Sequence, residues 1–344
     1  MTHNQIENYI KKIKQATDLS EKEAFHLTAY LLAGTWQDDN VEALLTAWRD
    51  KGETAGELAG AAKALRQLLP PFSSPDLATD CCGTGGDGLH TYNISTAVAF
   101  VAAACGIPMA KHGNRAASSL CGAADVLEEL GVQMILSPAA LAEALKLHNF
   151  CFLYAPQHHA ALKKLAPVRK KIKGRTIFNL LGPLANPAHT KYQLMGVFDP
   201  KWLKPMAQTL KNLGSKKALV VCAENGMDEI SLSVPTNAIL YNSQEMKTLH
   251  FTAKDFDLPE HKEDAIRGGD AQTNAQALLN VLHGNGSAYR DTVVANCAAI
   301  LWMHEHAESL KECAEIAQRA IDTKKALQIF ENYKEFSIRH SIER

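Results

Sequence analysis

Apolar residues recur at helical spacing through the first 70 residues, and this pattern predicts a run of short helices. The predicted helices lie around residues 6–13 and at residues 21–33, 41–51 and 58–69. Ser20 and Glu23 have the spacing of a capping box ahead of the second helix. Thr54 and Glu57 have the same spacing ahead of the fourth, and Asn40 is the expected N-cap of the third. No strand pattern interrupts these residues, so we expect a small all-helical unit.

Beyond a linker rich in Pro and Ser at residues 69–76, strand-like and helix-like segments alternate. The predicted strands cover residues 77–82, 107–111, 151–155, 217–223, 238–241 and 245–251. The predicted helices cover residues 96–105, 124–130, 138–147, 271–282, 289–305 and 310–330. Strands that alternate with helices predict a larger α/β unit with a mostly parallel central sheet.

Residues 157–187 fit this alternation poorly because they are rich in Lys, Arg, His and Pro. We expect residues 165–190 to leave the α/β unit and to return to the N-terminal helices. The expected domains are therefore a small helical domain of residues 1–72, joined by residues 165–190, and a large α/β domain of residues 73–164 and 191–344.

The composition argues against several classes of protein. With 36 Lys and Arg against 37 Asp and Glu, the formal net charge is −1, which disfavours a dedicated nucleic-acid-binding protein. The eight cysteines are scattered without a Cys-x-x-Cys pair, so neither a zinc ribbon nor a redox motif is indicated. The polar start is unlike a signal peptide, and no apolar run approaches the ~20 residues that span a bilayer. We expect a cytoplasmic protein without a membrane contact.

A glycine-rich loop at residues 83–96 gives the strongest functional signal. Its glycines are Gly83, Gly85, Gly86 and Gly88. Glycine permits left-handed backbone and lets a ligand approach the chain closely. The loop lies between a predicted strand and a predicted helix with Asn93, Ser95 or Thr96 as N-cap, an arrangement that suits a phosphate group. Residues 89–124 contain no Asp or Glu, so the sequence predicts an anion site here.

Two common nucleotide sites do not fit this loop. Residues 83–88 spell Gly-x-Gly-x-x-Gly, as dinucleotide-binding loops do. Such sites also need an acidic residue roughly 20 positions later for the ribose. Here no acidic residue follows the loop until Asp125, which disfavours a dinucleotide. The loop also lacks the Gly-Lys-Ser/Thr sequence of nucleotide triphosphatases.

Two further clusters carry charge beside predicted strands. Residues 111–119 follow a strand, and within them Lys111 and Arg115 can neutralise phosphate while Asn114 supplies uncharged hydrogen bonds. Asp228 and Glu229 follow another strand after a short turn. Adjacent carboxylates of this kind suit a Mg²⁺ ion that is also bound by water and by a substrate diphosphate.

Taken together, these segments resemble the anthranilate phosphoribosyltransferase family. The resemblance rests on residues 51–54, 83–96, 111–119, 166–169, 175–183, 226–231 and 290–291, in the order of that family. It implies a fold like that of nucleoside phosphorylases and phosphoribosyltransferases, with a small helical domain on a larger α/β domain. It also implies a homodimer formed through the helical domain. The implied reaction transfers the 5-phosphoribosyl group of PRPP to the amine of anthranilate in tryptophan biosynthesis, with release of pyrophosphate.

The resemblance also implies roles for individual residues. The positions that correspond to PRPP-binding residues are Gly83, Gly86, Asp87, Thr91, Asn93, Ile94, Ser95, Thr96, Lys111, His112, Gly113, Asn114, Arg115, Ser118, Ser119 and Ala123. Those that correspond to anthranilate-binding residues are Gly83, Asn114 and Arg169. Ser95, Asp228 and Glu229 correspond to ligands of two Mg²⁺ ions, and Lys111, Asn114 and Arg169 are the expected catalytic residues.

The chain departs from the family pattern at two places. Ala123 stands where the family often has a serine hydroxyl for PRPP, and Ala160 and Ala161 stand where Pro-Ala is usual. Two alternatives therefore remain open. One is a related phosphoribosyl- or ribosyltransferase with another aromatic acceptor, and the other is a non-catalytic relative that binds nucleic acid.

Overall fold

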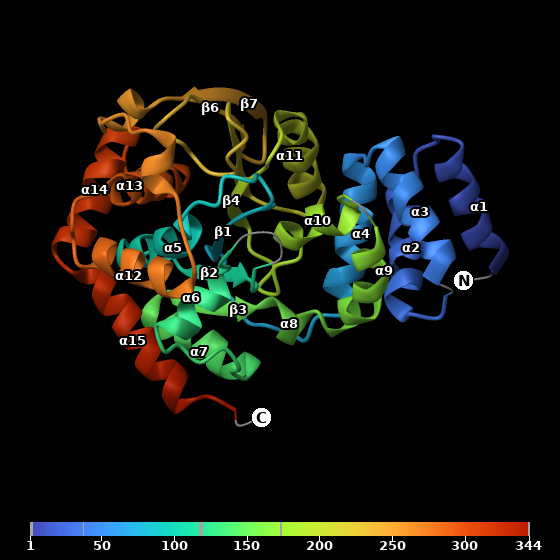
Figure 1. Ribbon diagram of the computed structural model, residues 1–344, viewed down its shortest axis with the longest axis horizontal. Helices are drawn as coiled ribbons and strands as arrows, with labels where there is room; N and C mark the ends of the chain where they lie inside the picture. Colours follow the sequence, from blue (N-terminus) through green and yellow to red (C-terminus); the bar gives the residue numbers. More distant parts are fainter. Residues whose placement is uncertain (1–2, 37, 117–119, 173, 343–344) are drawn as a thin grey trace.

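The computed structural model describes residues 3–36, 38–116, 120–172 and 174–342. Figure 1 shows a bundle of N-terminal helices beside a larger body in which helices surround a sheet. The predicted fold class, a small all-helical unit followed by a larger α/β unit, is confirmed. Within the described residues, no helix is both long and apolar enough to cross a membrane.

The bundle is built from helices with well-defined starts. Its helices are α1 (His3–Lys14), α2 (Glu21–Ala33), α3 (Asp38–Lys51) and α4 (Ala55–Gln67). Both predicted capping boxes are present, at Ser20 before α2 and at Thr54 before α4. The prediction of Asn40 as an N-cap is wrong, because α3 begins two residues earlier and places Asn40 in its first turn.

The larger unit is organised around a seven-stranded sheet in the described chain. Its strands are β1 (Thr79–Gly83), β2 (Met109–Gly113), β3 (Phe150–Tyr154), β4 (Tyr192–Gly196), β5 (Lys217–Ala223), β6 (Thr236–Tyr241) and β7 (Met246–Phe251). They lie in the order β3-β2-β1-β4-β5-β6-β7. The first five of that order pair in parallel, β6 pairs antiparallel with β5, and β7 pairs antiparallel with β6. The predicted, mostly parallel sheet is therefore correct.

Successive side chains of β5 point to two different cores. One core contains Leu219, Val221 and Ala223 of this strand, and the other contains Ala218, Val220 and Cys222. On the first face, α5 (Ile94–Ala104) and α13 (Ala288–Met303) pack on the sheet, with α14 (Leu310–Asp322) and α15 (Lys325–Arg339) against them. On the second face, α11 (Leu203–Asn212) packs between the sheet and α4 (Figure 1).

The remaining helices are short or lie at the edges of the sheet. They are α6 (Ala123–Glu129), α7 (Pro138–His148), α8 (Ala155–His158), α9 (Ala166–Lys171), α10 (Ile177–Leu181) and α12 (Ala271–Leu282). Short 3-10 turns cover Ala160–Leu165, Gly182–Leu184, Pro200–Trp202, Ala253–Phe256 and Glu263–Ile266. The segment from α9 to α10 buries Val168 and Ile177 in the same core as Trp48 of α3, and Figure 1 shows it beside the N-terminal helices.

The helix predicted at residues 310–330 is in fact two helices. The buried positions of α14 include Cys313, Ala317 and Ala320, and this phase would continue at Lys324 and Gln328, which are not apolar. The chain instead turns at Lys324, whose φ is 63°, and α15 begins a new buried face. The sequence pattern also missed β4 and α11.

Candidate active site

The loops that follow several parallel strands meet at the carboxyl edge of the sheet. The glycine loop follows β1, the segment from Gly113 follows β2, and the turn with Asp228 and Glu229 follows β5. Ligands of open α/β sheets bind in such a crevice. A cavity of about 660 Å³ lies there, and all three loops line it.

Close approach between two of these loops explains one glycine. A Cβ atom on Gly83 would lie 2.0 Å from Oδ2 of Asp228, so no larger residue fits without moving that carboxylate. The same oxygen accepts a hydrogen bond from the backbone N–H of Gly85 at 2.7 Å. The glycine loop is therefore shaped around Asp228.

The N-terminus of α5 opens into the cavity without a side-chain cap. Asn93 occupies the N-cap position, but its side chain makes no capping hydrogen bond. It donates instead to the carbonyl of Cys121 at 3.2 Å and accepts from Asn274 at 2.9 Å. Nearby, the hydroxyls of Thr84 and Thr96 are buried without a hydrogen-bond partner in the described residues. An uncapped helix start with spare hydroxyls suits a bound anion.

Lys111 brings a positive charge to the wall of this cavity. The residue is only 2% exposed, and its Nζ donates to the carbonyl of Cys81 at 2.8 Å. Asp80, which is also buried, accepts from Nδ2 of Asn186 at 2.7 Å and from the backbone N–H of His112 at 3.1 Å. Burial raises the pKa of the Asp80 carboxyl, while Lys111 and these hydrogen bonds act in the opposite direction. The lysine thus has a fixed place and a nearby counter-charge.

Arg115 lies at the rim with its charge already paired. Its Nη1 lies 3.1 Å from Asp125 and 2.5 Å from Glu128, and its Nε donates to the hydroxyl of Tyr154 at 3.1 Å. The hydrogen bond to Glu128 raises the pKa of this guanidinium above its ordinary value. Both cations expected for phosphate line the cavity, but Arg115 is already paired with carboxylates, whereas Nζ of Lys111 donates to backbone carbonyls.

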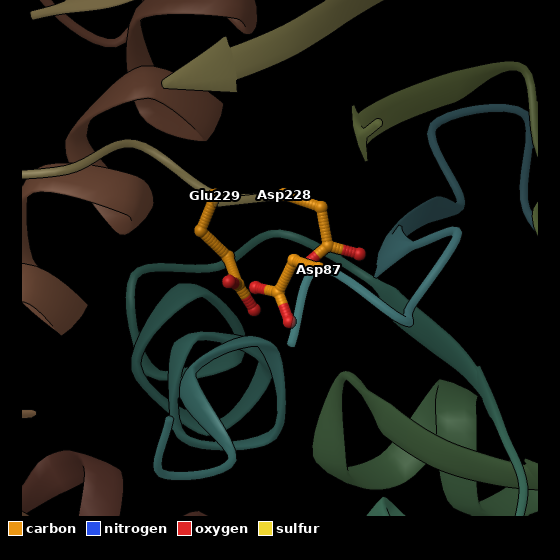
Figure 2. A group of neighbouring side chains, drawn as sticks. All are labelled: Asp87, Asp228 and Glu229. Atoms are coloured by element: carbon orange, nitrogen blue, oxygen red, sulfur yellow. The ribbon is translucent and has the colours of Figure 1, made fainter. Parts of the chain in front are cut away.

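Three carboxylates converge in the same cavity. One oxygen each from Asp87, Asp228 and Glu229 lies within 4.8 Å of the others, and Figure 2 shows the three groups pointing toward one another. Burial, followed by the charge of Asp87, raises the pKa of Asp228 to about 6. Burial and the Asp228 charge raise the pKa of Glu229 well above its ordinary value, and its Oε2 has no partner among the described residues. Crowded oxygen ligands with an unpartnered oxygen fit a divalent cation such as Mg²⁺.

A second cavity of about 380 Å³ adjoins the first. Its walls include Pro156, Leu162 and Phe178, and it contains Arg169, whose Cζ lies 5.7 Å from the centre of the Phe178 ring. Burial lowers the pKa of Arg169 relative to an exposed arginine. The second cavity is therefore mostly apolar, and the guanidinium of Arg169 supplies hydrogen-bond donors in it.

Neutral histidines lie in and next to the second cavity, where His112 lines both cavities, His159 lines the second, and His158 precedes His159 in the chain. Burial lowers the pKa values of His158 and His159 to about 4 and takes that of His112 well below its usual range. The Nε2 atoms of all three are buried without a partner in the described part of the chain. At pH 7 these rings are therefore uncharged, so they add no positive charge beside Arg169.

Both cavities share one strip of residues. The shared residues are Cys82, Gly83, Thr84, His112, Gly113, Asn114 and Asn179. A diphosphate ligand in the first cavity and an aromatic carboxylate in the second would therefore meet at these shared residues. The arrangement can therefore join an anionic donor to an aromatic acceptor.

The structure brings the residues singled out in the sequence together. The first cavity is lined by Gly83, Gly86, Asp87, Thr91, Asn93, Ile94, Ser95, Thr96, Lys111, His112, Gly113, Asn114, Arg115, Ala123, Asp228 and Glu229. Arg169 lies in the second cavity, away from the carboxylates. Ser118 and Ser119, also expected to bind PRPP, lie outside the described residues.

Sequence reasoning missed three features of the site. Asp87 was expected only as a PRPP contact, yet it joins the carboxylate cluster. Arg175 and Asn179 were noted only as parts of a family segment, yet both line the first cavity. The signal available was their position in a polar stretch that does not fit the sheet, but nothing in the sequence gave its distance from the glycine loop.

Comparison with known proteins adds an independent line of evidence. A profile described as "Glycosyl transferase family, a/b domain" matches residues 76–327, and one described as "Glycosyl transferase family, helical bundle domain" matches residues 7–68. The anthranilate phosphoribosyltransferase of Symbiobacterium thermophilum is 42% identical over 331 residues, which cover 96% of this chain and 97% of the relative.

Solved structures give the same result. Anthranilate phosphoribosyltransferase from Thermus thermophilus is 36% identical with a TM-score of 0.90, over 96% of this chain and 99% of that one. The Saccharomyces cerevisiae enzyme in complex with PRPP and Mg is 26% identical with a TM-score of 0.89, over 98% of this chain and 99% of that one. The family expected from the sequence is confirmed: the chain belongs to the anthranilate phosphoribosyltransferase family.

Proposed function

We propose that this protein transfers the 5-phosphoribosyl group of PRPP to the amine of anthranilate, giving N-(5-phosphoribosyl)anthranilate and pyrophosphate in tryptophan biosynthesis. The observation that carries the proposal is the pair of adjoining cavities that share Gly83 and Asn114. One cavity has the groups that suit a diphosphate, and the other has an apolar wall with Arg169. Membership of the family supports the same reaction.

The first cavity is the proposed PRPP site. The glycine loop, the open N-terminus of α5 and Lys111 supply hydrogen-bond donors and positive potential for the diphosphate and the 5-phosphate. Arg115, Ser118 and Ser119 belong to this proposal through the family resemblance. Ala123 lines the same cavity and has no hydroxyl, so the proposed site has one donor fewer than is common in the family.

The proposed metal ligands are Ser95, Asp228 and Glu229, and the geometry adds Asp87. Their crowding fits a bound cation, and the yeast relative was solved with PRPP and Mg. Mg²⁺ at this place, in the proposal as two ions, would neutralise negative charge on the departing pyrophosphate. Asp228 also orients the glycine loop through its hydrogen bond from Gly85.

The second cavity is the proposed anthranilate site. The planar fork of Arg169 suits a carboxylate on the aromatic ring, because it can donate two parallel hydrogen bonds. The neutral rings of His112 and His159 complete an apolar wall without competing for that carboxylate. Gly83 and Asn114 lie where the amine and the ribose would meet.

The proposed reaction needs little acid–base chemistry. The bond from C1 of the ribose to the pyrophosphate oxygen breaks, a bond from C1 to the anthranilate nitrogen forms, and that nitrogen then loses a proton. An arylamine is neutral and nucleophilic at pH 7, so a strong general base is not required. Lys111 and the start of α5 stabilise the charge that develops on the leaving group. Positioning of the two substrates supplies much of the rate.

Acceptor use tests this proposal. With Mg²⁺ and PRPP, the protein is expected to use anthranilate and not a pyrimidine base. Arg169→Ala is expected to raise the KM for anthranilate at least about tenfold, as the loss of a charge-assisted pair does, with little change in the KM for PRPP. Turnover with another acceptor but not with anthranilate would contradict the substrate assignment. A steep, salt-dependent affinity for DNA without turnover would favour the nucleic-acid-binding alternative.

The domain organisation is part of the same proposal. We place residues 1–72 and 165–190 in the small domain, because the segment from α9 to α10 shares a core with α3. Residues 73–164 and 191–344 form the large domain. A homodimer through the helical domain follows from the family resemblance, and the mass of the native protein in solution tests it.

A further inference from the structure

Arg175 reaches the glycine loop from a distant part of the chain. It lies just before α10, whose Ile177 and Phe178 are buried in the core shared with the N-terminal helices. Its Nη2 donates a hydrogen bond to the carbonyl of Gly86. Its guanidinium also lies over the ring of Phe198, with Cζ 3.1 Å from the ring centre. The side chain is therefore anchored on two sides at the edge of the first cavity.

One donor of Arg175 is not used. Its Nη1 is buried and has no hydrogen-bond partner in the described residues, although the side chain lines the cavity. A buried N–H of a charged group without an acceptor costs free energy, so such groups are uncommon unless a ligand completes them. The negative charges that act on Arg175 are those of Asp228, Asp87 and Asp199, and the first two belong to the carboxylate cluster.

The glycine loop is shaped to accept this arginine. Gly86 has a φ of 75°, a conformation that favours glycine. A Cβ atom there would lie 2.7 Å from Nη2 of Arg175, so a larger residue would displace the guanidinium. The absence of a side chain at Gly86 thus leaves the space in which Arg175 binds the carbonyl of that residue.

We propose that Arg175 is a diphosphate-binding residue that also fixes the glycine loop: Nη2 binds the carbonyl of Gly86, and Nη1 donates to an oxygen of the diphosphate of PRPP. This inference rests on the proposed function for the identity of the ligand. The guanidinium suits the role because its charge does not titrate near neutral pH and its donors have a fixed geometry. It would also bring a positive charge into the cavity that contains the carboxylate cluster.

The test is the binding of PRPP with Mg²⁺, measured by calorimetry without any acceptor. Arg175→Met is expected to weaken PRPP binding at least about tenfold, as expected for the loss of a charge-assisted hydrogen bond. Arg175→Lys is expected to recover part of this loss, because it keeps the charge but not the fork. Lys170→Gln is the matched control, since Lys170 is an exposed cation of α9, and it is expected to bind PRPP as the wild type does.

A second readout separates binding from a purely structural role. The KM for anthranilate and the unfolding midpoint of Arg175→Lys are expected to stay close to the wild-type values. Wild-type affinity for PRPP in Arg175→Met would overturn the inference, and so would equal losses for both substrates together with a lower midpoint. If Arg175→Met does not fold, unchanged PRPP affinity in Arg175→Lys overturns it. A wild-type protein that binds no PRPP would instead contradict the proposed function.

Discussion

At the scale of single residues, the carboxylate cluster that suits a cation also lowers the stability of the fold when its acids are ionised. Asp228 is buried, it accepts from Gly85, and it lies among two other carboxylates. Burial and then the charge of Asp87 oppose ionisation, and they raise the pKa of Asp228 to about 6. An acid whose pKa is raised by folding stabilises the fold at low pH, and this contribution is lost as the pH rises through about 6. Near neutral pH the cluster therefore costs stability in the absence of a cation.

Asp228→Asn should separate these two effects. The amide keeps an oxygen that can accept from Gly85, but it cannot ionise or bind a cation strongly. We expect a higher unfolding midpoint than that of the wild type at pH 7.5 without metal, and a loss of kcat/KM for PRPP of at least about 100-fold. Calorimetric scans and initial rates measure the two quantities. The matched control is Glu224→Gln, an exposed carboxylate on the same turn, which should change neither. A lower midpoint in Asp228→Asn would contradict the account.

At the scale of elements, helices from the C-terminal part of the chain hold the start of α5 in place. The hydroxyl of Tyr289 in α13 donates to the carbonyl of Asn93 at 3.0 Å, and Asn274 in α12 donates to the Asn93 side chain at 2.9 Å. Tyr289 also stacks on Tyr92, with ring centres 4.7 Å apart. Because Asn93 is the N-cap residue of α5 and lines the first cavity, these contacts link distant helices to the glycine loop.

Tyr289→Phe removes only the hydroxyl and keeps the stacked ring. We expect the KM for PRPP to rise about threefold to tenfold. The lost hydrogen bond, worth about 1 kcal/mol, holds the loop that binds the diphosphate in its binding conformation. Tyr333→Phe is the control, since its buried hydroxyl accepts from the backbone N–H of Phe152, in β3. That variant should lose similar stability without a change in the KM for PRPP. If the two variants had the same KM for PRPP, the hydroxyl of Tyr289 would have no role in PRPP binding beyond its contribution to stability.

The turn between α3 and α4 contains an acid with a perturbed pKa. Burial, the largest effect, raises the pKa of Glu53 to about 7, and the charge of Glu57 acts in the same direction. Glu53 therefore stabilises the fold below about pH 4.5, and this contribution is lost as the pH rises through about 7. Ionised Glu53 is thus unfavourable at alkaline pH.

Glu53→Gln should remove this dependence. We expect the free energy of unfolding of the variant to exceed that of the wild type by about 1–3 kcal/mol at pH 8.5, with a much smaller difference at pH 5. Denaturant unfolding at the two pH values measures it. A difference that is the same at both values would show that the carboxyl of Glu53 does not change its ionisation on folding.

At the scale of the whole molecule, one core connects the parts that the reaction needs to keep together. Side chains of α3, of the segment around α9 and of one face of β5 belong to the same core. Through this core the element that carries Arg169 and Arg175 is fixed against both the helical bundle and the sheet. The site therefore depends on packing between segments that are far apart in the sequence.

Local patterns predicted much of this architecture. The capping box at Ser20 predicted the observed start of α2, and the apolar run of residues 217–223 predicted β5 with its observed bounds. The capping box at Thr54 is also present, but α4 begins at Ala55, three residues before the predicted start. The prediction failed at the turn at Lys324, where one expected helix is two, and it missed the short strand β4. It also missed α11, although Leu203, Met206 and Leu210 stand at helical spacing and are buried. In the site, residue types and their order indicated a diphosphate and a metal. The reach of Arg175 to Gly86 could not be inferred, because it depends on how the segment before α10 folds back.

The central claim is that the two cavities bind PRPP and anthranilate side by side for transfer. Loss of anthranilate fluorescence tests it most directly, with purified protein, PRPP and Mg²⁺ mixed and followed over time. We predict that the fluorescence falls only when protein, PRPP and Mg²⁺ are all present, with one pyrophosphate released for each anthranilate consumed. Stable anthranilate fluorescence in the complete mixture, with a protein shown to be folded, would contradict the account.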